Sequence, residues 1–213
     1  MSSIVIIDYG MGNIHSISKA MEHVADASVL VSADPEQILR ADRVVFPGVG
    51  AIKDCMSELH RLELAAVLHE IAGTRPLLGI CLGMQALLDH SDENDGVDGL
   101  GIFAGQVKHF PVAKDASGAL LKVPHMGWNQ VYQTGQHPMW KGIEQDSRFY
   151  FVHSYYIDPT DANEAAGITT YGLEFASVLA RDMLFAVQFH PEKSQHAGLQ
   201  LLSNFATWDG QGG

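Results

Sequence analysis

The feature that most constrains the fold is the regular alternation of short apolar runs with amphipathic segments in the first half of the chain. Four apolar runs have the length and composition of buried strands, at residues 4–8, 27–31, 43–46 and 76–80. Stretches with helical spacing of apolar residues alternate with them, at about 13–23, at 51–71 and from about residue 83. Strands that alternate with helices form a parallel sheet covered on both faces. We therefore expect a parallel α/β core.

Strand-like segments dominate the second half. They are expected at residues 106–110, 127–132, 148–156, 175–181 and 183–189, before a last helix at about 194–208. The last two strands are joined through Arg181-Asp182 as a hairpin. Residues 90–99, rich in Asp and Gly, are expected to form a surface loop rather than a domain boundary. The sequence thus predicts one α/β domain over residues 1–213, with a mostly parallel central sheet flanked by helices and additional antiparallel strands.

The composition disfavours several classes of protein. A formal net charge of -12, with 13 Lys and Arg that never form a run, disfavours nucleic-acid binding, which needs a basic face. No apolar stretch approaches the roughly 20 residues of a membrane helix, and the start lacks the basic region of a signal peptide. The 2 cysteines, Cys55 and Cys81, do not suggest a disulfide framework. We expect a cytoplasmic protein with no membrane or nucleic-acid partner.

The segment around Cys81 carries the strongest indication of chemistry. A buried strand runs into Gly79-Ile80-Cys81-Leu82-Gly83 and then into a helix, the pattern of a nucleophile elbow with cysteine as the nucleophile. The helix N-terminus favours the thiolate, and the backbone N–H of Leu82 is an expected oxyanion-hole donor. Taken alone, the motif is equally compatible with a cysteine that packs as a small apolar residue. We assign Cys55, which has no glycines around it, to such packing.

A second motif, His190-Pro191-Glu192, follows the last predicted strand. Pro191 stiffens the step between the two side chains, so that Glu192 can accept a hydrogen bond from Nδ1–H of His190. Nε2 is then free to take the proton of a thiol, as in a Cys-His-acid triad. Taken alone, the motif also fits a surface pair or, with His196, a metal-ligand pair. No further cluster completes a tetrahedral set, and we expect no metal.

A third motif, Pro47-Gly48-Val49-Gly50, follows the strand at residues 43–46. A glycine-rich loop at the carboxyl end of a parallel strand can bring backbone N–H groups next to Cys81. We therefore expect Val49 and Gly50 to contribute the second donor of an oxyanion hole. An ordinary strand-to-helix turn would also account for these glycines.

With these motifs in this order, at residues 47–50, 79–85 and 190–192, the chain resembles the class I (triad) glutamine amidotransferases over essentially its full length. The resemblance implies a flavodoxin-like fold. It also implies that Cys81 attacks the side-chain amide of glutamine, which gives a glutamyl thioester and releases ammonia. Water activated by His190 then frees glutamate. No cofactor is implied.

Three further runs, at residues 8–13, 123–129 and 151–156, resemble one subgroup of this family, the glutaminase subunits of imidazole glycerol phosphate synthases in histidine biosynthesis. The resemblance implies a heterodimer with a β/α-barrel cyclase subunit. That subunit uses the ammonia to form imidazole glycerol phosphate and an aminoimidazole carboxamide ribotide. By the same resemblance, the residues expected to bind glutamine are Gly48, Gln85 and Glu93. Those expected at the partner face or the ammonia exit are Asn13, Trp128 and Lys193.

Other functions remain compatible with the motifs. The chain could be the glutaminase of another synthase, in the formation of pyridoxal phosphate, anthranilate or GMP. Those enzymes share the triad but not the runs at residues 124–129 and 151–156. It could also be a stand-alone thiol hydrolase or peptidase on the same fold. A catalytically inactive binding protein is disfavoured, because such a protein has no reason to retain Cys81, His190 and Glu192 together.

Overall fold

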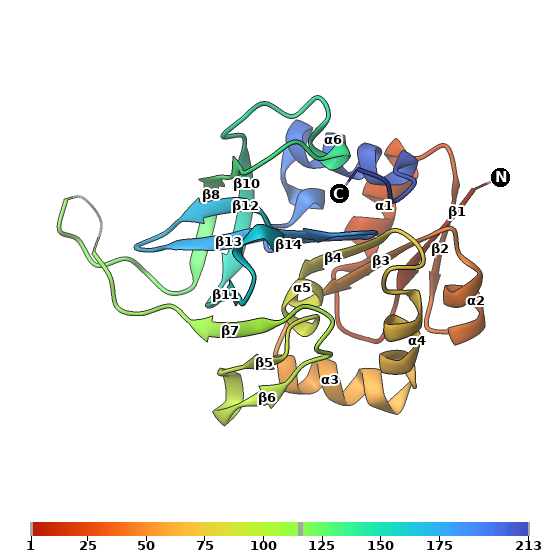
Figure 1. Ribbon diagram of the computed structural model, residues 1–213, viewed down its shortest axis with the longest axis horizontal. Coiled ribbons are helices and arrows are strands. Elements are labelled where there is room, and N and C mark those ends of the chain that lie inside the picture. Colours follow the sequence, from red (N-terminus) through yellow and green to blue (C-terminus); the bar gives the residue numbers. More distant parts are fainter. Residues whose placement is uncertain (1, 115–116, 213) are drawn as a thin grey trace.

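The computed structural model describes residues 2–114 and 117–212. Its longer strands are β1 (Ser3–Ile7), β2 (Ser28–Ser32), β3 (Arg43–Gly48), β4 (Leu77–Cys81), β7 (Gly105–His109), β8 (His125–Gln130), β10 (Arg148–His153), β11 (Tyr155–Pro159), β12 (Ala165–Thr170), β13 (Glu174–Arg181) and β14 (Leu184–Val187). The two-residue strands are β5 (His90–Ser91), β6 (Val97–Asp98) and β9 (Tyr132–Gln133). The described strands form a 12-stranded sheet and a separate pair, β10-β8 (Figure 1).

The parallel core predicted from the sequence is confirmed. Within the large sheet, β2, β1, β3, β4 and β14 lie side by side and every neighbouring pair is parallel. The remaining strands continue the sheet in the order β13-β11-β7-β5-β6, with β12 paired to β13 and β9 paired to β12. Most of these pairs are antiparallel, including the predicted hairpin β13-β14. The fold is thus a mostly parallel central sheet with additional antiparallel strands.

Helices cover both faces of the parallel strands (Figure 1). They are α1 (Ile14–Val24), α2 (Pro35–Arg40), α3 (Ile52–Arg61), α4 (Leu64–Ile71), α5 (Leu82–Ala86) and α6 (Gln195–Thr207). Ile6 of β1 shares a buried cluster with Ile17 of α1 and Leu201 of α6. The adjacent Ile7 shares the opposite cluster with Leu59 of α3. Because successive strand residues point to opposite faces, α1 and α6 cover one face and α2 to α5 the other.

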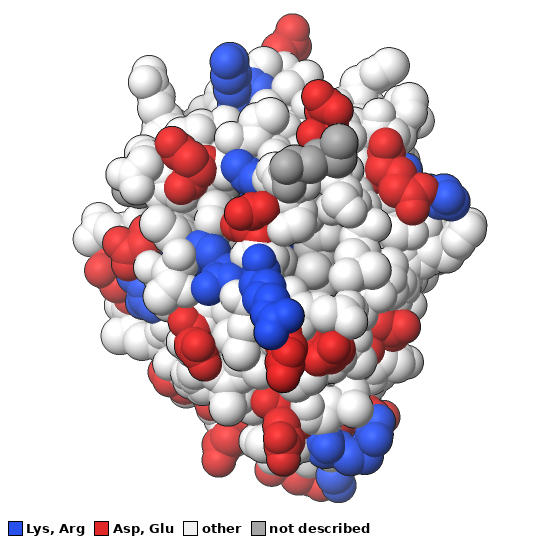
Figure 2. Space-filling view, turned by 90° about the vertical axis from the view of Figure 1, so that its right-hand side faces the viewer, with Lys and Arg blue, Asp and Glu red and all other residues white. Residues whose placement is uncertain are grey.

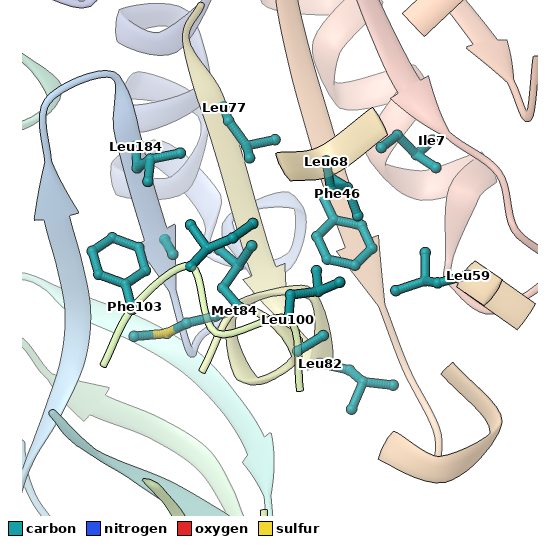
Figure 3. Packing of buried hydrophobic residues seen from close by; sticks show 14 of the residues in the cluster. Ile7, Phe46, Leu59, Leu68, Leu77, Leu82, Met84, Leu100, Phe103 and Leu184 are labelled. Atoms are coloured by element: carbon teal, nitrogen blue, oxygen red, sulfur yellow. The ribbon is translucent and has the colours of Figure 1, made fainter. Parts of the chain in front are cut away.

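Figure 3 shows how the second of these clusters holds α5 against the sheet. Leu82 and Met84 of α5 lie among Phe46 of β3, Leu77 of β4 and Leu184 of β14, and all five residues are buried. Burial of a large apolar side chain contributes about 1.5–3 kcal/mol. The short helix that follows Cys81 is therefore fixed by packing against three neighbouring strands.

Two of the predicted strands are each divided in the structure. Residues 148–156 form β10 and β11, and the break at Ser154 is where the chain passes from the small sheet to the large one. Residues 127–132 belong to β8 and β9, with Val131 between them. Neither break has a Gly or Pro at Ser154 or Val131, so the sequence pattern does not mark them.

The structure also contains elements that the sequence analysis did not predict. Helix α2 has only 6 residues, which is too short to display a helical period. Strand β12 is rich in small residues, and a Cβ at Gly167 would lie 2.9 Å from the side chains of Val131 and Val178. Residues 90–99, expected to be a loop, contain β5, β6 and the 3-10 turn η1 (Glu93–Asp95). Further 3-10 turns are η2 (Pro138–Trp140), η3 (Ala162–Glu164) and η4 (Pro191–Lys193).

The surface agrees with the scattered charges of the sequence. On the face in Figure 2, Lys and Arg do not gather into one basic patch and several lie beside acidic residues. Among the residues that the structure describes, no helix is long and apolar enough to cross a membrane. In the stretch 113–120, for which we predicted no element, Lys114 and Leu120 form an isolated bridge, and residues 115–116 lie outside the described part.

The contact between α5 and β3 makes Gly83 essential for stability. A Cβ at Gly83 would overlap the backbone carbonyl oxygen of Phe46, which cannot move without distorting β3. We expect Gly83→Ala to lower the free energy of unfolding by about 3 kcal/mol, the cost of overpacking against rigid neighbours. Urea unfolding measures this change. Gly135→Ala is the matched control, since a Cβ there meets nothing within 4 Å. Equal effects of the two substitutions would contradict this account.

Candidate active site

Cys81 lies at a sharp turn between β4 and α5. It is the N-cap of α5 and has φ 55° and ψ -111°, a conformation that costs a non-glycine residue about 1–3 kcal/mol. The nearest neighbour of a Cβ at Gly83 would be the backbone carbonyl of Phe46 on β3. Cys81 is 7% exposed and lies at the wall of a cavity of about 330 Å³. The turn thus presents the thiol to this cavity.

His190 and Glu192 lie at the same edge of the sheet as Cys81. β14 pairs with β4 in parallel, and the chain continues from β14 through two further residues to His190, so the strand ends earlier than predicted. Nδ1 of His190 lies 2.9 Å from Oε1 of Glu192, and both side chains are 3% exposed. The His190 N–H donates to the Tyr150 carbonyl at 2.9 Å. The Ser194 hydroxyl donates to the His190 carbonyl at 2.6 Å.

Opposing effects determine the charge of His190. Burial lowers the pKa of His190, while its interactions with Cys81 and Glu192 raise it, and the net result is a pKa of about 10. Its Nε2 is buried without a hydrogen-bond partner within the described residues and belongs to the cavity that Cys81 also lines. The interactions with Cys81 and Glu192 thus outweigh burial, and this environment favours the imidazolium form of His190.

The loop after β3 runs beside Cys81. β3 pairs with β4 in a register that places Gly48 next to Cys81. A Cβ at Gly48 would overlap the hydroxyl of Tyr9, so only glycine fits there without displacing that ring. Val49 and Gly50 line the cavity together with Leu82. The three expected oxyanion-hole residues are thus brought to one wall.

The residues expected to bind glutamine contact the same cavity or lie beside it. Gln85 and Glu93 line it, whereas Gly48 pairs with Cys81 in the sheet and lines a small second cavity beside His190. Glu93 Oε2 accepts a hydrogen bond from the Ile52 N–H at 3.0 Å, which ties η1 to the start of α3. Gln85 Nε2 donates to the Tyr155 carbonyl at 3.2 Å.

Several cavity residues were not assigned a role from the sequence. The segment around the β10–β11 break contributes Val152, His153, Ser154 and Tyr155, and the loop before β8 contributes Pro124. All five belong to the runs at residues 123–129 and 151–156, which carried the resemblance to the synthase subunits. That resemblance was the signal in the sequence by which they could have been assigned to the site. The buried Gln188 also contacts Cys81, with Nε2 3.8 Å from Sγ.

The residues expected at a partner face lie outside the main cavity. Asn13 caps α1 and lines a small second cavity beside His190 and Glu192. Trp128 is 38% exposed, and its ring lies 6.1 Å from the ring of Tyr150. Lys193 Nζ lies 5.9 Å from the centre of the same Tyr150 ring. Trp128 and Lys193 therefore form one group around Tyr150, next to the His190 segment.

Comparison with known proteins identifies the family. The model of the family "Glutamine amidotransferase class-I" matches residues 5–207. The chain belongs to the class-I glutamine amidotransferases. It is 57% identical over 211 residues to imidazole glycerol phosphate synthase subunit HisH 1 of Pseudomonas aeruginosa, with 99% of each chain covered. It is 59% identical to the HisH subunit of Nitrosococcus oceani, again with 99% of each chain covered.

Solved structures of this class share the fold at low sequence identity. The glutaminase domain of Trypanosoma brucei CTPS, solved with bound acivicin, superposes with a TM-score of 0.64 at 17% identity, covering 98% of this chain and 95% of that one. PurLQS from Thermotoga maritima gives a TM-score of 0.69 at 14% identity, with 96% and 97% covered. The flavodoxin-like architecture of a class-I glutamine amidotransferase is thus confirmed.

Two other groups of reactive side chains in this amidotransferase are buried and paired with neighbouring side chains. Cys55 is fully buried, burial raises its pKa to about 12, and its thiol lies 3.5 Å from the Tyr9 hydroxyl. His125 and His153 form a hydrogen-bonded pair at 2.9 Å, and burial lowers their pKa values to about 4 and about 3. Among the described residues, no group of three or more His, Cys, Asp or Glu could hold a metal ion.

The interactions that raise the pKa of His190 make a prediction about its titration. Because the pKa of His190 is raised above 6.5 to about 10, the ring should still be protonated at pH 8. We expect Cys81→Ala to lower this pKa, since one raising interaction is lost while burial still opposes the charge. NMR titration of the His190 ring signals measures both values. Cys55→Ala serves as the control and should titrate like the wild type; an unchanged pKa in Cys81→Ala would refute the pairing.

Proposed function

We propose that this chain is the glutaminase subunit of an imidazole glycerol phosphate synthase in histidine biosynthesis, with Cys81, His190 and Glu192 as its triad. The observation that carries the chemistry is the meeting of a strained cysteine with a buried His–Glu pair at one cavity. Similarity over 99% of the chain to subunits of that name supports the pathway. The proposed reaction needs no cofactor, and its place in amino-acid biosynthesis suits the cytoplasm.

The first half of the proposed reaction releases ammonia. The Cys81 thiolate attacks the side-chain amide carbon of glutamine, and the carbonyl π electrons move onto its oxygen. The backbone N–H groups of Leu82 and of the Val49–Gly50 loop would stabilise this oxyanion. As the tetrahedral intermediate collapses, the His190 imidazolium gives its proton to the departing nitrogen. Ammonia leaves, and a glutamyl thioester remains on Cys81.

The second half restores the enzyme. Neutral His190 takes a proton from water, and the resulting hydroxide attacks the thioester carbonyl. The C–S bond breaks, glutamate leaves, and Cys81 is again a thiolate beside a protonated His190. Glu192 orients the ring through Nδ1 and stabilises its positive charge. The cycle is balanced because each proton that His190 gives up is regained from water.

The proposed partner is a β/α-barrel cyclase subunit with which this chain forms a heterodimer. Its apolar surface near the cavity supports such a contact: Val49, Val123, Met126 and Trp128 are all exposed large apolar residues. Aromatic residues such as Trp128 are frequent anchors of protein interfaces. A partner seated there would receive ammonia from the edge of the sheet at which Cys81 lies, and would use it to make imidazole glycerol phosphate and an aminoimidazole carboxamide ribotide.

The assignment of the nucleophile is tested by Cys81→Ala in the complex with the cyclase. We expect glutamine-dependent synthesis to fall to background, because no thioester can form, while synthesis from added ammonium is retained. Formation of imidazole glycerol phosphate with each nitrogen source measures both. Cys55→Ala should keep both activities. Retention of glutamine-dependent synthesis by Cys81→Ala would disprove the proposed chemistry.

The partner is tested by the glutaminase activity of the isolated chain. Val49 is 39% exposed at the wall of the cavity, where a docked subunit can change the orientation of its peptide group. We therefore expect slow glutamine hydrolysis by the chain alone and an increase of at least about tenfold in the complex, the effect of one oxyanion-hole donor being about 10²–10³. Glutamate release with and without the cyclase measures this. If the isolated chain hydrolyses glutamine as fast as the complex does, the partner does not control the orientation of the Val49 peptide group.

A further inference from the structure

The side chain of Gln188 is the most unusual polar group near the candidate nucleophile. Gln188 is 0% exposed and lies between the end of β14 and His190. Its Nε2 lies 3.8 Å from Sγ of Cys81, and its Oε1 accepts from Nε2 of Gln85 at 2.9 Å. Its backbone N–H donates to the carbonyl of Ser177 on β13. Both ends of the side-chain amide therefore have one defined neighbour.

The orientation of this amide follows from a chain of hydrogen bonds. The carbonyl oxygen of Tyr155 can only accept, so the NH₂ group of Gln85 must face it. The second hydrogen of that NH₂ group is then available to Gln188, which must present Oε1 to it. The NH₂ group of Gln188 consequently points to Cys81. A backbone carbonyl thus determines that the sulfur faces a donor rather than an acceptor.

A buried amide in this place has a cost that packing alone does not justify. An apolar side chain of similar size would fill the space without desolvating an amide, which costs about 1–3 kcal/mol when a donor or acceptor lacks a partner. Among the described residues, Cys81 Sγ is the acceptor within hydrogen-bonding distance of Gln188 Nε2. A neutral thiol is a weak acceptor, whereas a thiolate accepts a charge-assisted hydrogen bond. The pairing is therefore most favourable when the sulfur is ionised.

We propose that Gln188 is a further catalytic residue, which donates a hydrogen bond to the Cys81 sulfur and holds it as the thiolate. This inference rests on the proposed function, since it assigns a role at the same nucleophile. Gln85 acts through Gln188 as a positioning residue. The two hydrogens of the Gln85 amide are donated to the Tyr155 carbonyl and to Gln188. Its Oε1 is therefore available to accept a hydrogen bond in the cavity in which glutamine is expected to bind. The same chain thus connects the substrate cavity with the attacking atom.

The test uses Gln188→Met in the complex with the cyclase, because methionine has nearly the same shape and no donor. We expect kcat for glutamine hydrolysis to fall about tenfold with KM changed less than about twofold, as expected for loss of one hydrogen bond to a charged group. Alkylation of Cys81 by iodoacetamide should slow at neutral pH, and its rate profile should move to higher pH. Synthesis from ammonium should be unchanged.

Ser177→Ala is the matched control, because Ser177 is equally buried, lies beside Gln188 and bonds through its hydroxyl to Thr169 instead of Cys81. It should keep the wild-type alkylation profile. Wild-type alkylation by Gln188→Met would overturn the role of Gln188 even if that variant is less stable. Should Gln188→Met not fold, Gln188→Leu, which also has no donor and adds no charge, must show the same slower alkylation. Glutamine-dependent synthesis by Cys81→Ala would instead overturn the proposed function. A failure of the role of Gln188 is thus distinguishable from a failure of the proposed function.

Discussion

The close packing of α5 against β3 is the constraint on which the candidate site depends. Cys81 has a positive φ that an isolated chain would avoid, and nothing in its own turn compensates for that. The turn persists because β4 lies between β3 and β14 in the sheet, and because Leu82 and Met84 are buried beneath it. Gly83 permits this approach. The favourable packing of the core thus holds Cys81 in its strained backbone conformation, which presents the thiol to the cavity.

The antiparallel half of the molecule has a definite role in this arrangement. β14 enters the sheet next to β4 only because β13 precedes it as its hairpin partner and runs in the opposite direction. The carboxyl ends of β3, β4 and β14 then meet at one edge, which brings together Gly48, Cys81 and His190. β11 pairs with β13 and supplies the Tyr155 carbonyl. The strands that interrupt the parallel pattern therefore deliver the base and orient its surroundings.

The sequence predicted the parts of the site that depend on local pattern. The glycines around Cys81, the His-Pro-Glu motif and the apolar runs each have a signature within a few residues, and the parallel order of strands follows from their alternation with helices. The break at Ser154 could not be predicted, since apolar and aromatic residues flank it on both sides and neither Gly nor Pro marks it. Gln188 could not be assigned either. Its function depends on Gln85 and Tyr155, which come near it only in the folded chain.

The length of α5 changes the account of how the thiolate is stabilised. From the sequence we expected the N-terminus of a helix to stabilise the thiolate. However, α5 has 5 residues, little more than one turn, and a helix that short has only a small macrodipole. Direct partners must therefore provide most of the stabilisation. The amide nitrogen of Gln188 lies 3.8 Å from Cys81 Sγ, and His190, two residues further along, lines the same cavity as Cys81, so one stretch of chain would supply the counter-charge and the hydrogen bond. The proton needed by the departing ammonia would then already be on His190 before glutamine is attacked.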